Sequence, residues 1–156
     1  MSINTMWIIL DIALLTGAAL NTYWQSKLIE RAHYNYWMIL YSVFYLFFIW
    51  WTPYTGEAYI VLIAALILLN FQSGVGGFTE RGVMGNHFFS TITPYTDLTA
   101  ITLTRFKVVQ NDKERVIATI VTRRNHRIQL IFNHTAEELE QVIQPKLPTE
   151  VSVTIQ

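Results

Sequence analysis

The pattern of hydrophobic and polar positions divides the chain into two parts. Before residue 75 the apolar residues form three long runs with few polar interruptions, over about residues 6–24, 36–53 and 56–73. A helix that is apolar on every side leaves no polar face for water, whereas apolar residues at every second position are typical of a half-buried strand. The pattern therefore predicts an α+β protein, with a helical region over residues 1–75 and a β-sheet region over residues 76–156.

The three apolar runs are predicted to be transmembrane helices. A helix crosses the hydrocarbon layer with roughly 20 apolar residues, and the second and third runs are slightly shorter than this. Aromatic side chains gather near the ends of the runs, where their rings favour the membrane–water interface; they are Tyr23, Trp24, Tyr34, Tyr36, Trp37, Trp50, Trp51, Tyr54 and Tyr59. The alternative is a soluble helical domain with a very apolar core. A cleaved signal peptide is disfavoured because residues 1–5 contain no Lys or Arg.

Basic residues predict the orientation. The loop after the first run, residues 25–35, carries Lys27 and Arg31, whereas the second loop, residues 52–56, contains Pro53 and no basic residue. Basic loops lie on the cytoplasmic side. We therefore expect a multi-pass protein of the cell membrane, with the N-terminus outside and the region after Gly74 in the cytoplasm.

Residues 74–86, GVGGFTERGVMGN, hold five of the seven glycines in the chain. A phosphate-binding loop needs glycines at set intervals between a strand and a helix. Here Thr79 stands where a third glycine is required, and an apolar helix precedes the run. The run is instead predicted to end the third helix and to open a hairpin, with positive φ angles tolerated at residues 84–86.

The second half changes to the two-residue period of strands. The expected strands are 82–84 and 87–91, which form a hairpin, and 97–109, 115–123 and 127–133, which form an antiparallel meander with turns at 110–114 and 123–126. The apolar positions change parity between Leu103 and Phe106, so a bulge is predicted near Arg105. About five strands are expected in all.

A helix is predicted after the meander. Thr135 and Glu138 have the spacing of a capping box, and Ala136, Leu139, Val142 and Ile143 form one apolar stripe. Pro145 and Pro148 end the helix. The tail from Thr149 to Gln156 alternates, so it is either an added edge strand or a frayed end.

The second half resembles a known kind of domain. Arg81-Gly82-Val83 follows the last run, Tyr95-Thr96-Asp97-Leu98 lies within FFSTITPYTDLTAITL (88–103), and TAEELEQVIQPKL (135–147) closes the chain. This order is similar to that of small membrane proteins of Gram-positive bacteria, an uncharacterised family among them, that carry a bacterial pleckstrin-homology-like domain. The resemblance implies a pleckstrin-homology-like (PH-like) cytoplasmic fold for roughly the last half of the chain, and no catalytic residues.

Asp11 is the leading candidate site residue, because an ionised carboxylate inside a membrane costs at least a few kcal/mol unless it is paired. It lies about five residues, or roughly 7 Å, into the first run. It is either a polar contact to a proton, an ion or another subunit, or a side chain that reaches the outer interface or bonds to Tyr59 or Tyr54. Ala13 and Gly17 form a small-xxx-small pair that permits close helix packing, within the chain or between chains.

Metal binding and catalysis are not indicated. The histidines, His33, His87, His126 and His134, are dispersed, no serine lies in a nucleophile context, and the chain has no cysteine. We therefore expect no catalytic residues, no metal and no cofactor.

Basic residues on the strands and turns are candidates for a surface that faces lipid or a partner; they are Arg105, Lys107, Arg123, Arg124 and Arg127. After residue 78 nine basic residues (11 minus 2) balance eight acidic ones (11 minus 3), which argues against nucleic-acid binding. The pattern favours a non-catalytic membrane protein whose cytoplasmic domain binds protein or lipid. The alternative is an accessory or immunity-type subunit that contacts a transporter or channel through its helices. The expected partners are membrane lipids and either a membrane protein or a second copy of the chain.

Overall fold

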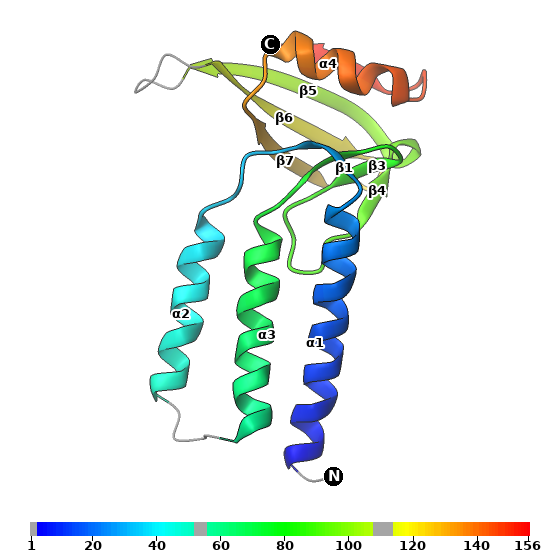
Figure 1. Ribbon diagram of the computed structural model, residues 1–156. Coiled ribbons are helices and arrows are strands. Elements are labelled where there is room, and N and C mark those ends of the chain that lie inside the picture. The colour runs from blue at the N-terminus through cyan, green and yellow to red at the C-terminus, as the bar shows by residue number, and fades with distance from the viewer. Residues whose placement is uncertain (1–2, 52–55, 108–113) are drawn as a thin grey trace. The chain divides into compact units, whose positions relative to one another are not determined.

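The computed structural model describes residues 3–51, 56–107 and 114–156, which form four α-helices and two four-stranded β-sheets (Figure 1). These elements separate into two compact units. The helical unit comprises Met1–Ser26, Tyr34–Val75 and Asn86–Ser90, and the sheet unit comprises Lys27–His33, Gly76–Gly85 and Thr91–Gln156. The units therefore depart from the predicted boundary at 75/76 in two short segments, 27–33 and 86–90.

The helical unit contains α1 (Ile3–Gln25), α2 (Trp37–Trp51) and α3 (Glu57–Ser73), at the positions of the three apolar runs (Figure 1). Helix α3 contacts both α1 and α2. Gly56, in extended conformation, caps the start of α3, and Gly74 caps its end. The predicted loop with Pro53 and Tyr54 lies outside the described residues.

A narrow apolar seam joins α1 to α3. Trp7 and Leu14 of α1 pack against a cluster on α3; its members are Tyr59, Leu62, Ile63, Leu66 and Ile67. The rings of Trp7 and Tyr59 meet edge to face, with centroids 5.9 Å apart. The spacing of three and four residues along α3 places Tyr59, Leu62, Ile63 and Leu66 on the face that meets α1.

The glycine run ends α3 and permits close backbone approach in the sheet that follows. Gly77 has φ 153°, and a Cβ atom there would lie 2.1 Å from the carbonyl oxygen of Glu30. A Cβ atom on Gly82 would lie 2.0 Å from the carbonyl oxygen of Thr93. Residues 84–86, which the sequence marked as tolerant of positive φ, do not use this conformation; among the described residues only Gly77 and Asn125 have a positive φ.

The first sheet has the order β1-β2-β3-β4 and is antiparallel throughout. Its strands are β1 (Leu28–Arg31), β2 (Gly77–Thr79), β3 (Gly82–Met84) and β4 (Ile92–Pro94). The predicted strand at 87–91 was wrong, because β3 pairs with 92–94 instead. Strands β1 and β2 were not predicted at all. All three residues of β2 are buried, as are those of β3, so no alternation marks them in the sequence.

The second sheet has the order β7-β6-β5-β8. Strands β5 (Leu98–Lys107), β6 (Glu114–Thr122) and β7 (Arg127–Phe132) form the predicted antiparallel meander. The turn between β6 and β7 is tight because Asn125 adopts φ 59°, a conformation that Asn tolerates. The predicted turn at 110–114 lies almost entirely outside the described residues. The tail forms β8 (Ser152–Ile155), a parallel edge strand beside β5, so the frayed alternative was wrong.

In β5 the alternation of buried and outward-facing positions changes phase at the start of the strand. The register with β6 shifts between Leu98 and Ala100 and is continuous from Ala100 to Lys107. The extra residue places Leu98 and Ile101 on the same buried face although they are three positions apart. The prediction of a bulge near Arg105 was therefore wrong in its position.

Helix α4 (Ala136–Ile143) contributes to the core of the sheet unit through Ala136, Leu139 and Ile143. Its predicted capping box is present, since the side chains of Thr135 and Glu138 each accept a hydrogen bond from the other residue's backbone N–H. Residues of both sheets complete this core, and the stacked rings of Phe78 and Phe132, 5.3 Å apart, lie within it.

The two sheets adjoin at both sides of this core. After β1, the backbone N–H of His33 donates to Ile131 of β7, and after β4 the short 3₁₀ helix Tyr95–Asp97 leads directly into β5. The α+β class, the antiparallel meander and the C-terminal helix are thus confirmed, whereas the parallel pairing of β8 with β5 was not predicted. The small sheet that was predicted is in fact two sheets, with eight strands in the described residues. The PH-like fold stays a prediction.

Candidate functional site

The outer surfaces of α1, α2 and α3 are covered by exposed large apolar side chains. They include Met6, Ile8, Ile9, Leu10, Ile12, Leu15, Leu20, Ile39, Leu40, Val43, Phe44, Leu46, Phe47, Ile60, Val61, Leu68 and Phe71. Monomeric soluble proteins rarely expose contiguous apolar patches larger than a few hundred Å². An apolar surface on three neighbouring helices therefore indicates a non-aqueous neighbour, either lipid or protein.

Most charged residues lie in the sheet unit. All 11 Lys and Arg residues of the chain fall in the segments of the sheet unit. Strand β1 carries Arg31 and follows Lys27 directly, so it brings the two basic residues of the first half into that unit. In the helical unit the only Asp and Glu residues are Asp11 and Glu57.

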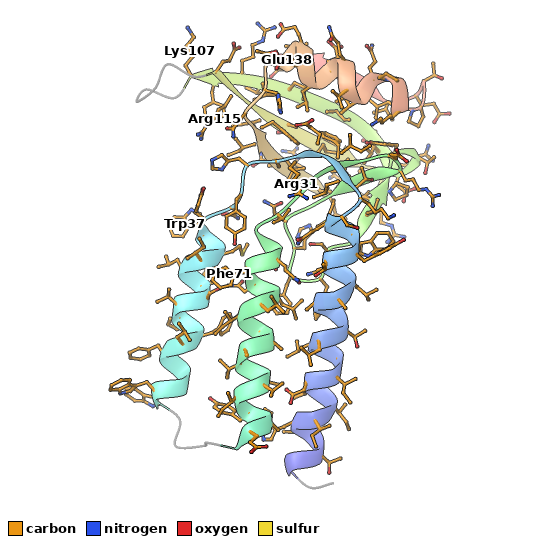
Figure 2. The ribbon with its side chains drawn as sticks, viewed as in Figure 1. Arg31, Trp37, Phe71, Lys107, Arg115 and Glu138 are labelled. Atoms are coloured by element: carbon orange, nitrogen blue, oxygen red, sulfur yellow. The ribbon has the colours of Figure 1, made fainter. Side chains whose placement is uncertain are left out.

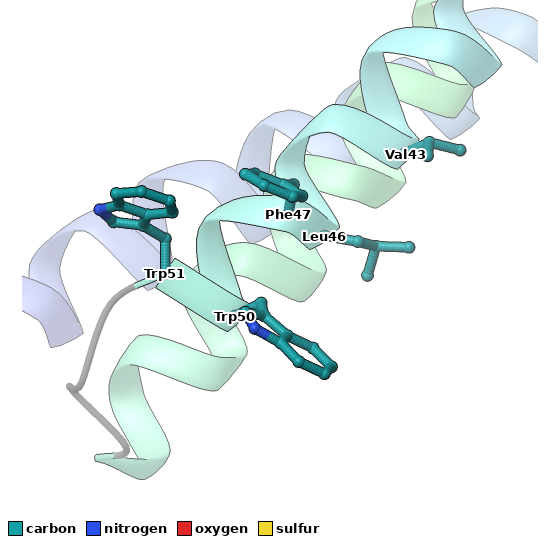
Figure 3. A pocket seen from close by; sticks show the side chains of 5 residues that line it. All are labelled: Val43, Leu46, Phe47, Trp50 and Trp51. Carbon is teal, nitrogen blue, oxygen red and sulfur yellow. The ribbon is translucent and has the colours of Figure 1, made fainter.

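Helix α2 exposes many large apolar side chains, among them Leu40, Phe44 and Trp50. A shallow groove on it is lined by Val43, Leu46, Phe47, Trp50 and Trp51, and Figure 3 shows these side chains projecting from successive turns of this one helix. Trp50 is 88% exposed and Trp51 is 76% exposed. Because one helix alone forms the groove, it is a surface for lipid or a packing partner and not an enclosed site for a small molecule.

Asp11 is buried in the helical unit, with 7% of its surface exposed. Among the described residues no group makes a hydrogen bond to its Oδ1 atom. Because α1 begins at Ile3, Asp11 lies about 12 Å from the start of the helix, deeper than the sequence suggested. The carboxylate is therefore buried within the helical unit, and both interpretations of Asp11 stay predictions.

Ala13 and Gly17, the small-xxx-small pair, have different surroundings. Ala13 is exposed, whereas Gly17 is buried against the ring of Phe89. A Cβ atom on Gly17 would lie 2.6 Å from the Cε1 atom of that ring. Within the chain the pair is thus not a helix-packing motif.

Two asparagines in the helices, which the sequence analysis did not single out, make buried polar contacts. The Nδ2 atom of Asn70 donates to the backbone oxygen of Met38 at 2.7 Å and to Ser42 Oγ at 2.9 Å, which joins α3 to α2. Asn21 makes a comparable pair of bonds to residues 88 and 90. An amide within an apolar run was the available signal, since a polar side chain at such a position requires a partner.

The five predicted basic residues do not form one cluster. Arg105 and Lys107 lie at the end of β5 where Lys107 is paired with Glu114, and Figure 2 shows Lys107 and Arg115 at this end of the sheet. Arg123, Arg124 and Arg127 flank the opposite end, about 30 Å away along the strand. Arg105 forms ion pairs with Glu114 and Glu137, and Arg123 pairs with Glu150 at 3.1 Å. Lys107, Arg124 and Arg127 are exposed.

The histidines are likewise separate. His134 Nε2 lies 2.6 Å from Glu30 Oε1, and its Nδ1 atom lies 3.5 Å from Glu138 Oε2, so His134 links α4 to β1 within the sheet unit. Over residues 3–51, 56–107 and 114–156 there is no group of three or more His, Cys, Asp and Glu side chains placed to hold a metal ion.

Fewer helices have the length and composition of a membrane span than carry an exposed apolar surface. Among the described residues one helical stretch, the 21 residues Thr5–Gln25, is long and apolar enough to cross a membrane by length and composition alone. Trp37–Phe47 and Glu57–Ser73 are shorter apolar helices. Core helices of soluble proteins and signal sequences can have the same length and composition, so the three-span arrangement remains a proposal.

Comparisons of the chain with protein-family models, with curated proteins and with solved structures find no match. The resemblance to membrane proteins with a PH-like domain therefore remains a prediction from residues 81–83, 88–103 and 135–147.

Proposed function

We propose that this protein is a non-catalytic, multi-pass protein of the cell membrane. Helices α1, α2 and α3 lie in the bilayer, and the sheet unit, a PH-like domain, is a cytoplasmic module that binds protein or lipid. The observation that carries the proposal is the exposed apolar surface of the three helices, together with the absence of Lys and Arg from the helical unit.

Helix lengths are compatible with this arrangement. At about 1.5 Å per residue, the 23 residues of α1 extend about 35 Å, and the described 15 and 17 residues of α2 and α3 extend about 22 and 26 Å. A bilayer adapts to shorter helices by local thinning, at a cost of fractions of a kcal/mol per Å. The short helices thus modify the bilayer around them but do not prevent insertion.

Strand pairing supports the proposed topology. Strand β1 follows α1 and β2 follows α3, and the two strands are hydrogen-bonded partners. Three spans place the ends of α1 and α3 on the same side of the membrane, as this pairing requires. All the Lys and Arg residues lie in the unit on that side, which favours the cytoplasm and an N-terminus outside.

Single cysteines test the membrane arrangement directly, because the natural chain has none. With an impermeant maleimide on intact cells, Thr5→Cys should react, and Gln141→Cys on α4 should react only after permeabilisation. Leu15→Cys on the exposed face of α1 should react in neither case. Reaction of Leu15→Cys in water would refute membrane insertion, and reaction of Gln141→Cys in intact cells would refute the cytoplasmic placement.

The proposal that the sheet unit binds a partner rests on the open edge of a strand. Among the described residues strand β8 is the last strand of its sheet and pairs with β5 alone, and Thr154 at its middle is exposed. An edge strand offers unpaired N–H and C=O groups to a partner chain. The exposed Lys107, Arg124 and Arg127 add positive charge for anionic lipid, each worth about 1 kcal/mol near the membrane surface.

A second candidate function follows from Asp11: an accessory or immunity-type subunit that contacts a transporter or channel through its helices. The supporting observation is the buried Oδ1 atom without a hydrogen-bond partner among the described residues. A photo-crosslinking side chain at Thr154 or at Ile12, which is exposed beside Asp11, separates the two candidates. A discrete product from Thr154 supports the module. A product from Ile12 that Asp11→Leu abolishes supports the helices.

A further inference from the structure

The segment Asn86–Ser90 connects two strands of the sheet unit but belongs to the helical unit. Its sequence, NHFFS, contains two adjacent aromatic residues and no Asp, Glu, Lys or Arg. It has no regular secondary structure, although the sequence predicted a strand over 87–91. A loop packed on apolar helices requires partners for its backbone polar groups.

Asn21 of α1 provides these partners. Its side chain is 1% exposed; Nδ2 donates to the backbone oxygen of Phe88 at 3.0 Å, and Oδ1 accepts from the backbone N–H of Ser90 at 3.0 Å. The hydroxyl of Ser90 donates to the backbone oxygen of His87 at 2.8 Å. One buried amide therefore satisfies a carbonyl and an N–H of the loop, and the loop satisfies a second carbonyl itself.

The ring of Phe89 packs the loop against α1, close to α3. Its ring lies against Gly17 of α1, where the absence of a side chain leaves room for it, and Leu69 of α3 borders the same space. The rings of Phe88 and Phe89 meet edge to face, with centroids 5.0 Å apart. Phe89 nevertheless remains 56% exposed, so one side of its ring has no protein neighbour.

The position of the loop along the helices gives its depth. Gly17 and Asn21 precede the last residue of α1 by eight and four residues, which corresponds to about 12 and 6 Å. Leu69 precedes the last residue of α3 by four residues, or about 6 Å. The exposed side chains of Leu20 and Leu68 occupy the same levels. If these helices span a bilayer, the loop lies below their cytoplasmic ends.

We propose that Asn86–Ser90 is a re-entrant loop that inserts Phe88 and Phe89 into the cytoplasmic interface of the bilayer. This inference rests on the proposed membrane location. Lipid acyl chains cover the exposed side of Phe89, because Leu20 and Leu68 at the same helix levels are also exposed and the loop contains no Asp, Glu, Lys or Arg. Non-helical backbone is tolerated at this depth only when its polar groups have partners within the protein, and Asn21 supplies two of these hydrogen bonds. The proposal differs for this loop from the sequence-based expectation that all residues after Gly74 are cytoplasmic.

Spin-label accessibility in lipid nanodiscs tests the proposal. A nitroxide at Phe89→Cys should be relaxed more by oxygen, which concentrates in lipid, than by a water-soluble nickel chelate. A label at Leu15→Cys is the lipid reference, and a label at Gln141→Cys is the aqueous reference. The ratio of oxygen to nickel accessibility at position 89 should be close to the lipid reference and several-fold above the aqueous one.

Two second-site variants test the mechanism. Asn21→Leu removes both hydrogen bonds to the loop, and Gly17→Val fills the space against which the side chain at position 89 packs without touching those bonds. Each should lower the ratio at position 89 several-fold while the label at Leu15→Cys keeps its value, which shows that α1 is still inserted. Asn70→Leu, which removes a similar amide from the α2 side of α3, should leave position 89 unchanged.

The possible outcomes are distinct. An aqueous ratio at position 89 with a lipid ratio at Leu15→Cys overturns the re-entrant loop and leaves the proposed function intact. Aqueous ratios at both positions overturn the membrane location as well. Low accessibility to both reagents at position 89 means that protein, such as a second copy of the chain, covers Phe89, and this also overturns the lipid contact.

Discussion

Replacing Asp11 by Leu should make the protein more stable. The carboxylate is 7% exposed, and among the described residues its Oδ1 atom has no hydrogen-bond partner. In the proposed membrane location, an acidic side chain within a transmembrane helix costs about 3 kcal/mol, whereas leucine contributes about −0.5 kcal/mol, a difference of about 3.5 kcal/mol. The larger side chain must fit at a buried position of α1, and overpacking of this kind costs about 1–2 kcal/mol. The expected net gain is about 2 kcal/mol.

The assay is reversible unfolding of the full-length protein in mixed micelles, with Asp11→Asn as the nearly isosteric control. Asn removes the charge without adding volume, so Asp11→Asn should also be at least as stable as the natural protein. If Asp11 serves a partner, both variants should lose the cross-link from Ile12 while they gain stability, because functional polar groups are often retained at a cost in stability. A loss of more than about 1 kcal/mol in both variants would refute the reasoning, since it would show that the carboxylate is paired in the native protein.

Three further predictions concern the two units separately. Asn70→Ala removes two hydrogen bonds that join α3 to α2 and should cost about 1–2 kcal/mol in the same unfolding assay, whereas Ser42→Ala, which removes one of them, should cost less. Thr135→Ala removes the N-cap of α4 and should lower the stability of the sheet unit by about 1 kcal/mol, and the exposed Thr149→Ala serves as its control; equal effects of the two would contradict the capping role. Burial raises the pKa of Tyr95 from its ordinary value of 10.0 to about 12, so the folded protein keeps a proton that the unfolded chain loses in this range. Its contribution to stability is therefore fully present below pH 10 and is lost as the pH rises to about 12, and Tyr95→Phe should lose less stability over this interval when chemical unfolding is followed at both pH values.

Local patterns in the sequence were sufficient to predict the four helices and the antiparallel meander. The three apolar runs became α1, α2 and α3, and the capping box at Thr135 begins α4 as predicted. The meander followed from alternation, because β6 has one face on the core and one toward solvent. In each case the signal lies within the element itself, in residues that are close along the chain.

The short strands of the first sheet left no comparable signal. Strands β2 and β3 have three residues each, all buried, so neither alternation nor length distinguishes them. The sequence of strand β1, which ends at Arg31, is typical of a polar loop. It forms a strand because it pairs with β2, which follows it in the chain only after α2 and α3. The bulge was misplaced for a related reason, since the register shift depends on the pairing of Leu98 with Thr122.

The sequence by itself determined that apolar helices precede a mixed α+β region, and it placed Asp11 within the first helix. Tertiary structure decided how deeply Asp11 is buried, that Lys27 and Arg31 join the sheet unit, and that residues 86–90 belong with the helices. The physical reason is the range of the interactions. Hydrophobic periodicity reports how each residue is buried within its own element, whereas strand pairing and the contact between Asn21 and Ser90, 69 residues apart, depend on segments that only the folded chain brings together.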